Sequence, residues 1–462
     1  MEFIITLIER VYGFLWGDWI HIPLPGGGVL GLPLLVLLLF PTGIYFTVRT
    51  RFLPVRLFPD MLRTLREKAG KEGGGLSSLQ ALIVSTATRV GMGNLVGVVA
   101  AISMGGAGAV FWMWITALLG SATAFIEATL AQLHKQKDPL YGGFRGGPAY
   151  YIHDWISGKR KGKPRKSVLA ALFAVSGLIC WCGVSQVISN SVTSSFENAF
   201  SIPPIYTTAA LVVLAAVIVL RKNASVKVLD ILVPVMAGFY TVITLVLIVT
   251  HVGQLGSVLA RIFAEAFGLR QIAAGGFGAV LMNGVKRGLF SNEAGSGSAP
   301  CAAATAETDH PAKVGLMQAL GVFIDTLLCT CTALIMLLAP GEATEGLVGM
   351  DLLQTAMAAH LGQFGVVFIA VILWLFSFTT FIGILFYARS NVAYLFGDRW
   401  SAQTLYKILA LGMLFVGGLA AYTFVWDLGD VGIGLMTIFN LIALLPMSGE
   451  ALQSLRDYEK TL

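Results

Sequence analysis

Two short stretches place polar residues and glycines inside apolar runs. They read TRVGMGNLVG at 88–97 and GVKRGLFSNEAGSGSAP at 284–300. In the first stretch, Gly91 and Gly93 allow the backbone to leave helical geometry without a Cβ clash. A helix interrupted there exposes N–H groups, which suit a carboxylate, and C=O groups, which suit a small cation or an ammonium. Both stretches are therefore candidate binding sites for a small zwitterionic solute.

Asn94 adds a neutral amide directly after the first glycines. Its side chain could ligate a cation, contact a substrate or hydrogen-bond a neighbouring helix. Gly93 and Gly97 also fit a small-xxx-small packing face between helices. A nucleotide-binding loop is not expected, because no strand precedes the stretch and the third glycine is misplaced.

Arg89 lies at a depth where a charge is costly. A charged side chain at a helix centre costs about 2.5–3.5 kcal/mol on insertion scales, so Arg89 needs a partner or water. Three carboxylates in other apolar runs are candidate partners: Glu127, Glu293 and Asp325. Two interpretations stay open, a structural or gating ion pair and a direct contact with substrate. Lys286 and Arg287 have the same alternatives.

Adjacent hydroxyls occur in the apolar run FSFTTFIG at 376–383. Thr379 and Thr380 could each bond a carbonyl one turn earlier in the same helix. If they face the carbonyls of an interrupted helix, they become candidate ligands for a monovalent cation, which prefers neutral oxygens.

The composition defines the surroundings of these residues. Hydrophobic residues make up 56% of the 462 residues, charged residues 12%, and mean hydropathy is +0.79. Soluble domains carry roughly 25% charged residues, so the chain is expected to be an all-α polytopic membrane protein. Eleven spans are predicted: 30–48, 77–105, 108–133, 168–193, 203–220, 227–250, 272–306, 313–339, 361–388, 403–424 and 429–447.

Basic residues alternate between the two sides of these spans. Of 31 lysines and arginines, 25 fall on the side of the loops after the odd-numbered spans, and 3 fall on the other side. The positive-inside rule then predicts an outside N-terminus and a cytoplasmic C-terminus in a cell membrane. The net charge of +6 follows from this topology, so nucleic acid is not expected as a partner, whereas membrane lipid is.

The interrupted spans occupy matching positions. If the first span is set aside, the breaks fall in core helices 1 and 6 of two five-helix halves with opposite orientation. Such an inverted 5+5 repeat is typical of transporters, whose site lies between the broken helices. The predicted segments are an interfacial N-terminal segment (1–28, with Trp16 and Trp19 near the headgroups), an extra helix and loop (29–76), two repeats (77–250 and 271–448) and a cytoplasmic tail (449–462).

Three segments together resemble the alanine or glycine:cation symporter family: TRVGMGNLVGVVAAISMGGAGAVFWMWITALLG (88–120), YGGFRGGPAYYI (141–152) and the stretch at 284–300. The SNEAG-x-GSAP block and the GGP-x-YYI loop are distinctive, and the similarity runs through most of the chain. The resemblance implies sodium-coupled uptake of a small neutral amino acid, eleven helices and the leucine-transporter-type fold.

The resemblance also implies roles for individual residues. Substrate-binding positions resemble Gly91, Met92, Gly93 and Asn94 of core helix 1, Ile188 of core helix 3, and Phe290, Ser291, Asn292 and Gly295 of core helix 6. Sodium-site positions resemble Ala87, Val90, Phe376, Thr379 and Thr380. Gating or ion-pair candidates are Arg89, Glu127 and Glu293. Sodium is expected as the coupling ion, without another cofactor, and the sequence leaves the oligomeric state open.

Two positions depart from the family pattern. Met92 stands where the family usually has threonine, and Ile188 where it often has glutamine. Both changes replace polar side chains by apolar ones, so the pocket is expected to prefer a neutral amino acid other than alanine. Gln186 lies about half a turn from Ile188 and could compensate.

Other function classes fit less well. An intramembrane serine hydrolase needs a histidine near its nucleophile, and all six histidines fall in loops or at span ends. Channels usually build filters from repeated loops or rings of charge, so a channel is a distant alternative. A proton-coupled carrier is the closer alternative, with Glu127 or Glu293 as its titrating group.

Overall fold

The computed structural model describes residues 2–23, 29–65, 76–158, 166–221, 226–267, 276–344, 346–420 and 422–462. Strands in these residues form two short antiparallel pairs: β1 (Asp18–Pro23) with β2 (Val29–Pro33), and β3 (Gln136–Lys137) with β4 (Phe144–Arg145). Everything else that is regular is helical, which confirms the all-α fold class.

The helices follow the predicted apolar runs. The first half of the chain contains α1 (Glu2–Trp16), α2 (Leu34–Arg49), α3 (Leu53–Arg56), α4 (Phe58–Thr64), α5 (Ser78–Arg89), the π-helical turn η1 (Gly93–Gly97), α6 (Val98–Gly105), α7 (Gly108–Leu133), α8 (Pro148–Gly158), α9 (Val168–Phe200), α10 (Pro204–Val219) and α11 (Val226–Thr250). The second half contains α12 (Val252–Phe267), α14 (Phe277–Asn292), α15 (Pro300–Ala303), α16 (Pro311–Leu337), α17 (Gly341–Thr344), α18 (Gly349–Phe396), α19 (Trp400–Gly417) and α20 (Tyr422–Glu459).

Six described helices are long and apolar enough to cross a membrane, or seven if the bent pair α5 and η1–α6 is one span. The count of eleven spans therefore stays a prediction. Two features stand out among those that the sequence does not predict. Residues 252–267 form helix α12, which buries one face through Val258, Ile262 and Ala266. In addition, α18 begins at Gly349 and bends at Gly362, where φ is 59°.

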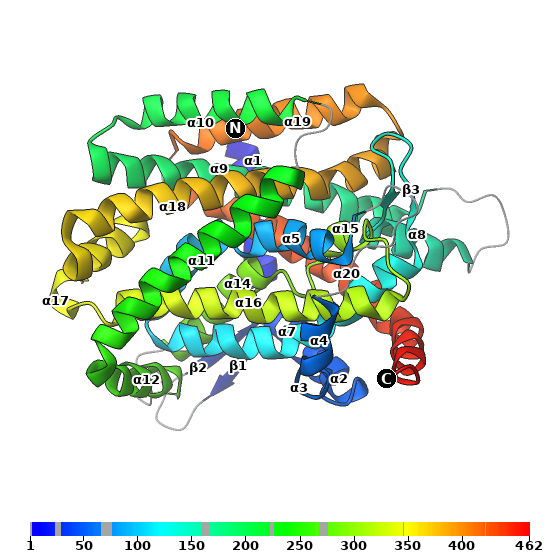
Figure 1. The fold of residues 1–462 in the computed structure, drawn as a ribbon, viewed down its shortest axis with the longest axis horizontal. Coiled ribbons are helices and arrows are strands. Elements are labelled where there is room, and N and C mark those ends of the chain that lie inside the picture. Colours follow the sequence, from blue (N-terminus) through cyan, green and yellow to red (C-terminus); the bar gives the residue numbers. More distant parts are fainter. Residues whose placement is uncertain are drawn as a thin grey trace.

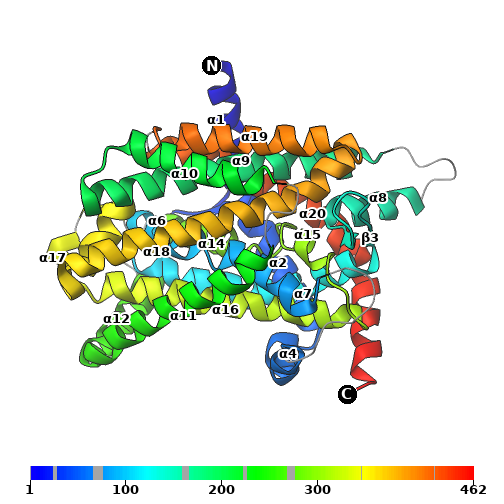
Figure 2. The same cartoon turned by 45° about the horizontal axis from the view of Figure 1, so that its top comes forward.

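Three pairs of helices that hold matching positions in the predicted halves pack against each other. Helix α7 packs on α16, α9 on α18, and α10 on α19. Figure 1 shows α10 and α19 along the upper edge and α7 and α16 in the lower half, and Figure 2 shows the same pairs after rotation. Helices α12 and α17 lie at one end of the long axis, whereas β3, α8 and the C-terminus lie at the other (Figure 1).

The N-terminal helix packs inward rather than lying free. Helix α1 contacts α20, and Trp16 is only 2% exposed, with its indole N–H donating to the Asp430 carbonyl at 3.1 Å. This differs from the surface position expected for Trp16, because the apolar face of α1 finds a protein partner. Trp19 is 51% exposed.

A histidine joins three helices at the end of α7. His134 Nδ1 lies 3.0 Å from Asp154 Oδ2 on α8, and its Nε2 lies 2.9 Å from Glu450 Oε2 on α20. Burial acts to lower the pKa of His134, but the hydrogen bonds and charges of the two carboxylates outweigh burial and raise it. The charged imidazole therefore stabilises the folded state.

We expect His134→Gln to destabilise the protein more at low pH than at high pH. The contribution of His134 is fully present below its unfolded-state pKa of about 6.5. It is lost as the pH rises through the raised pKa of the folded protein. Thermal unfolding of both proteins between pH ~6 and pH ~9 tests this. A difference in Tm that does not shrink with rising pH would contradict it.

Candidate functional site

The first interrupted helix has the break that the sequence predicts at 90–94. Ser77 and Gln80 form a capping box that fixes the start of α5. The helix ends at Arg89 because Val90 leaves helical geometry, with a ψ of 74°. The chain then continues as η1 and α6, and the two half-helices are bent by 43°.

The break is packed tightly against α18. A Cβ at Gly91 would lie 2.0 Å from Thr380 Oγ1, so this approach requires glycine. Met92 N donates to Thr380 Oγ1 at 3.1 Å, and Thr380 Oγ1 donates to the Ala87 carbonyl at 3.3 Å. One threonine hydroxyl thus pairs with an N–H and a C=O on the two sides of the break, where neither group has a helical partner.

The second interrupted helix has its break after α14. Glu293 has a φ of 58°, and Gly295 and Gly297 have φ of 91° and 82°. Glycine adopts this left-handed region freely, whereas a non-glycine residue held there costs roughly 1–3 kcal/mol. Asn292 Oδ1 accepts from the Ala294 N–H at 2.9 Å and closes the turn.

Asn94 and Asp325 connect the two breaks. Asn94 Oδ1 accepts from the Gly91 N–H at 3.0 Å, and its Nδ2 donates to Asp325 Oδ1 on α16 at 2.8 Å. Ser291, from the last turn of α14, donates to the same Asp325 oxygen at 2.6 Å. Asn94, Ser291 and Asp325 are each at most 2% exposed. We call these three residues the break-bridging cluster.

The predicted ion pairs of Arg89 do not form among the described residues. Arg89 Nη1 donates to the backbone carbonyl and Oε1 of Gln318 at 3.0 and 3.1 Å, while its Nε and Nη2 have no hydrogen-bond partner. Arg89 is fully buried. It therefore attaches core helix 1 to α16, and its gating role stays a prediction.

The two candidate glutamates bind other polar groups around the second break. Glu127 Oε1 on α7 accepts from the Gly295 N–H at 3.2 Å, and its Oε2 accepts from Asn440 at 3.0 Å. Glu293 Oε2 accepts from Tyr387 at 3.1 Å and from Thr88 at 3.3 Å. Both carboxylates thus hold the irregular backbone of core helix 6 in place.

Only some of the predicted sodium ligands lie close to one another. Thr380 lies against Ala87, as described above, whereas Thr379 Oγ1 donates to the Phe376 carbonyl of its own helix at 3.0 Å. Val90 lies at the end of α5, where its carbonyl no longer follows the helix. Neutral hydroxyl and unwound carbonyl oxygens suit sodium, so the chemistry of Ala87 and Thr380 fits the ion.

We expect Thr380→Val to raise the sodium concentration for half-maximal uptake about 5–10-fold, as loss of roughly 1–1.5 kcal/mol would. Thr379→Val is the matched control, because its hydroxyl serves its own helix, and its effect should stay below about 3-fold. Sodium titrations of uptake measure both values. Equal effects of the two substitutions would refute this ranking.

A charged cluster lies at the start of α20, beside α1. Arg287 donates from Nη1 and Nη2 to the two oxygens of Asp430, both at 3.0 Å, and Lys286 Nζ lies 3.3 Å from Asp430 Oδ2. The Lys286 ammonium also donates to Tyr12 of α1 at 2.7 Å. The Arg287 guanidinium stacks 3.8 Å from the Trp426 ring centroid.

The remaining predicted substrate-binding residues are buried around the breaks. Phe290 packs edge-on against Trp426, with ring centroids 5.1 Å apart. Met92 and Ile188 are fully buried in the main apolar core. Their place in a substrate pocket stays a prediction. Gln186 Nε2 faces the Met413 sulfur at 3.4 Å, and its Oε1 has no partner.

Sequence reasoning missed several polar residues that hold the site. The sequence indicates Asp325 only as a candidate partner of Arg89, although an intramembrane carboxylate is itself a signal for a functional cluster. Tyr387 and Asn440 received no prediction, because single hydroxyl and amide groups in apolar runs usually bond within or between helices. Their partners become evident only when the helices are packed.

The sequence is similar to a known family and to named proteins. The model of the sodium:alanine symporter family matches residues 25–462. The "Probable sodium/glutamine symporter GlnT" of Bacillus subtilis is 42% identical over 431 residues, covering 92% of this chain and 88% of that protein. The "Sodium/alanine symporter AgcS" of Methanococcus maripaludis is 34% identical over 472 residues, covering 100% and 98%.

A solved structure shares the fold. A mutant of the Eremococcus coleocola manganese transporter superposes with a TM-score of 0.52 at 15% identity, covering 84% of this chain and 81% of that chain. At this identity the likeness concerns the fold alone.

The family match extends over nearly the whole chain and confirms the resemblance carried by the 88–120, 141–152 and 284–300 segments. Its members are transporters, which are not a class of enzyme. The chain belongs to the sodium:alanine symporter family.

Proposed function

We propose that the protein is a sodium-coupled symporter that imports a small neutral amino acid, such as alanine or glycine, by alternating access. The observation that carries the proposal is the break-bridging cluster, which joins two interrupted helices through Asp325. Interrupted helices at midplane are where transporters of this architecture bind ions and zwitterions.

The binding steps follow from the partners of the first break. The Gly91 and Met92 N–H groups are paired with Asn94 Oδ1 and Thr380 Oγ1. A substrate carboxylate would replace these side-chain oxygens, and sodium would bind between the Ala87 carbonyl and the Thr380 hydroxyl. The ammonium would meet carbonyls of the second break, at 290–295. Differential affinity of the ion for the outward-open state would couple the two fluxes.

The proposed topology has an outside N-terminus, a cytoplasmic C-terminus and two inverted repeats, at 77–250 and 271–448. The packing of α7 on α16, α9 on α18 and α10 on α19 supports the repeats, since these pairs hold matching positions. Helices α12 and α17 lie at the opposite end of the molecule from α8 and the C-terminus (Figure 1). This separation supports a topology in which successive loops alternate between the two sides of the membrane.

A symporter for a different neutral amino acid is the main alternative. Names of relatives include both a sodium/glutamine and a sodium/alanine symporter. Met92 favours this alternative, because an apolar side chain at the break changes what the pocket accepts. We expect Met92→Thr to shift the substrate ranking toward alanine, as measured by competition for uptake. An unchanged ranking would count against a role for Met92 in selectivity.

Uptake into proteoliposomes tests the proposal. Labelled alanine, glycine, serine, glutamine and leucine would each be offered under an inward sodium gradient, under potassium, and under a proton gradient alone. Accumulation of one amino acid only under sodium is the expected result. Accumulation under the proton gradient would establish the proton-coupled alternative. Downhill flux without accumulation would indicate a channel.

A further inference from the structure

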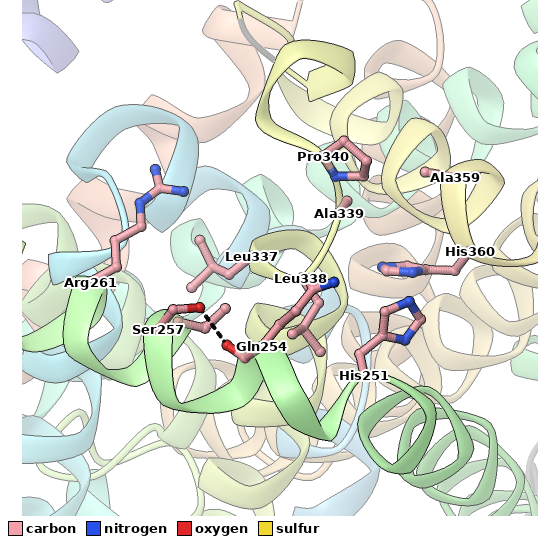
Figure 3. Close-up of a pocket in the computed structure, with 11 residues that line it drawn as sticks. His251, Gln254, Ser257, Arg261, Leu337, Leu338, Ala339, Pro340, Ala359 and His360 are labelled. Atoms are coloured by element: carbon pink, nitrogen blue, oxygen red, sulfur yellow. Dashed lines mark hydrogen bonds between the residues drawn. The ribbon is translucent and has the colours of Figure 1, made fainter.

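A cavity unconnected with the two breaks lies at the end of the molecule that carries α12 and α17. Its volume is about 530 Å³, and it opens between the start of α12, the end of α16 and the first segment of α18. Figure 3 shows the two histidines that face each other on its wall, His251 and His360. Their ring centroids are 4.8 Å apart, with an interplanar angle of 73°.

Each imidazole has one nitrogen committed to a backbone carbonyl. His251 Nδ1 lies 2.9 Å from the Leu247 oxygen, and His360 Nε2 lies 2.9 Å from the Ile335 oxygen. A carbonyl only accepts, so these two nitrogens carry the hydrogens in the neutral rings. Nε2 of His251 and Nδ1 of His360 each retain a lone pair.

This arrangement is the one that metal-binding histidines adopt. A ligating imidazole usually donates its other N–H to a carbonyl or carboxylate, which fixes its tautomer and orientation. Zinc binds imidazole nitrogen at about 2.0–2.1 Å and takes four ligands in a tetrahedron. The described residues offer no cluster of three His, Cys, Asp or Glu side chains, so water in the cavity would complete the shell.

The one charged side chain on the described cavity wall is an arginine that is paired with a glutamate. Arg261 also lines the cavity (Figure 3), and its cation would oppose a bound metal ion. Its Nε donates to Glu265 Oε1 at 2.7 Å, however, so the guanidinium is paired. Two ring nitrogens with free lone pairs on one cavity wall favour a cation over an anion.

We infer that His251 and His360 form a binding site for one zinc-class divalent transition-metal ion, with water as the remaining ligands. The ion would link two connections of the fold. His251 lies between α11 and α12, and His360 lies two residues before the bend at Gly362 of α18. Thr380 lies further along the same helix, α18. A bound ion that holds α18 to α11 would therefore slow transport, a consequence that rests on the proposed function.

Zinc chloride is titrated calorimetrically into the purified full-length protein in detergent. The test variants are His251→Asn and His360→Gln, whose amide N–H groups keep the bonds to Leu247 and Ile335. His21→Ala on the exposed strand β1 is the matched control. We expect one zinc per wild-type chain and an affinity at least about tenfold weaker in both variants, because even loss of an outer-shell partner costs about 10–100-fold.

Unchanged affinity in both variants, or an equal loss in His21→Ala, would overturn the site. Correct folding is checked by an unaltered elution volume and Tm. The link to transport is tested separately, as inhibition of sodium-driven uptake by external zinc that both variants relieve. If zinc binds without inhibiting uptake, only the proposed effect on transport is overturned. If the protein shows no uptake at all, the proposed function fails, and the calorimetry still tests zinc binding by His251 and His360.

Discussion

Replacing Asp325 by alanine is expected to lower the initial rate of sodium-driven uptake at least about 30-fold. The substitution removes the carboxylate acceptor that Asn94 and Ser291 share, two buried groups from different broken helices. The backbone carbonyl of residue 325 and the Cys329 sulfur remain as uncharged partners. A hydrogen bond to a charged acceptor contributes roughly 1.5–3 kcal/mol, and loss of about 2 kcal/mol in total already gives this factor. Uptake per amount of reconstituted protein is the measurement.

Two further variants make this result specific. Asp325→Asn keeps an acceptor oxygen and should retain more transport than Asp325→Ala. Thr326→Val, next in sequence, is the matched control, because Thr326 bonds only the Val322 carbonyl of its own helix. If Asn and Ala at position 325 were equally inactive, the negative charge rather than the acceptor would be required. Full activity of Asp325→Ala would refute the role of the break-bridging cluster.

Replacing Asp430 by alanine should produce the largest loss of stability. The carboxylate lies between the Arg287 and Lys286 cations, and all three side chains are 1% exposed. Removal of one member of a buried ion pair costs about 3–5 kcal/mol, because an uncompensated charge stays inside. Here two cations would stay. The loss is measured as a lower Tm of the detergent-solubilised protein, followed by tryptophan fluorescence.

Asp457→Ala is the control for Asp430→Ala. Asp457 pairs with Lys460 at 2.8 Å on the exposed end of α20, and exposed ion pairs contribute little to stability. Similar Tm values for the two variants would show that the buried charges are solvated or rearranged. A double variant with Arg287→Met and Asp430→Leu should recover part of the loss, because a buried ion pair can often be replaced by apolar residues.

Local signals made much of the fold predictable. The apolar runs predicted most helix positions because spacing and length of such runs depend on the bilayer rather than on distant contacts. Glycines at 91, 93, 295 and 297 predicted both interruptions for a similar reason, since backbone freedom is a local property. Helix α12 was missed because an amphipathic surface helix lacks the uniform apolar character of a span.

Side-chain partners were less predictable than positions. Arg89 was expected to pair with a carboxylate, yet it bonds Gln318, while Asp325 accepts from Asn94 and Ser291. All of these residues meet only after helices from both halves have packed. A sequence shows that a buried charge needs a partner. Which of several polar groups at similar depth becomes that partner depends on how the packed helices are rotated and shifted relative to one another.

The contact of α1 with the charged cluster has a consequence for the energetics of the transport cycle. An inverted repeat alone would make the outward-open and inward-open arrangements nearly degenerate. Helix α1 precedes the proposed repeat, so the bond that Lys286 donates to Tyr12 and the bond that Trp16 donates to Asp430 have no symmetry mate. In the proposed topology, these bonds lie on the outer half of core helices 6 and 10. In that arrangement they would break the degeneracy and favour the state that is closed to the outside.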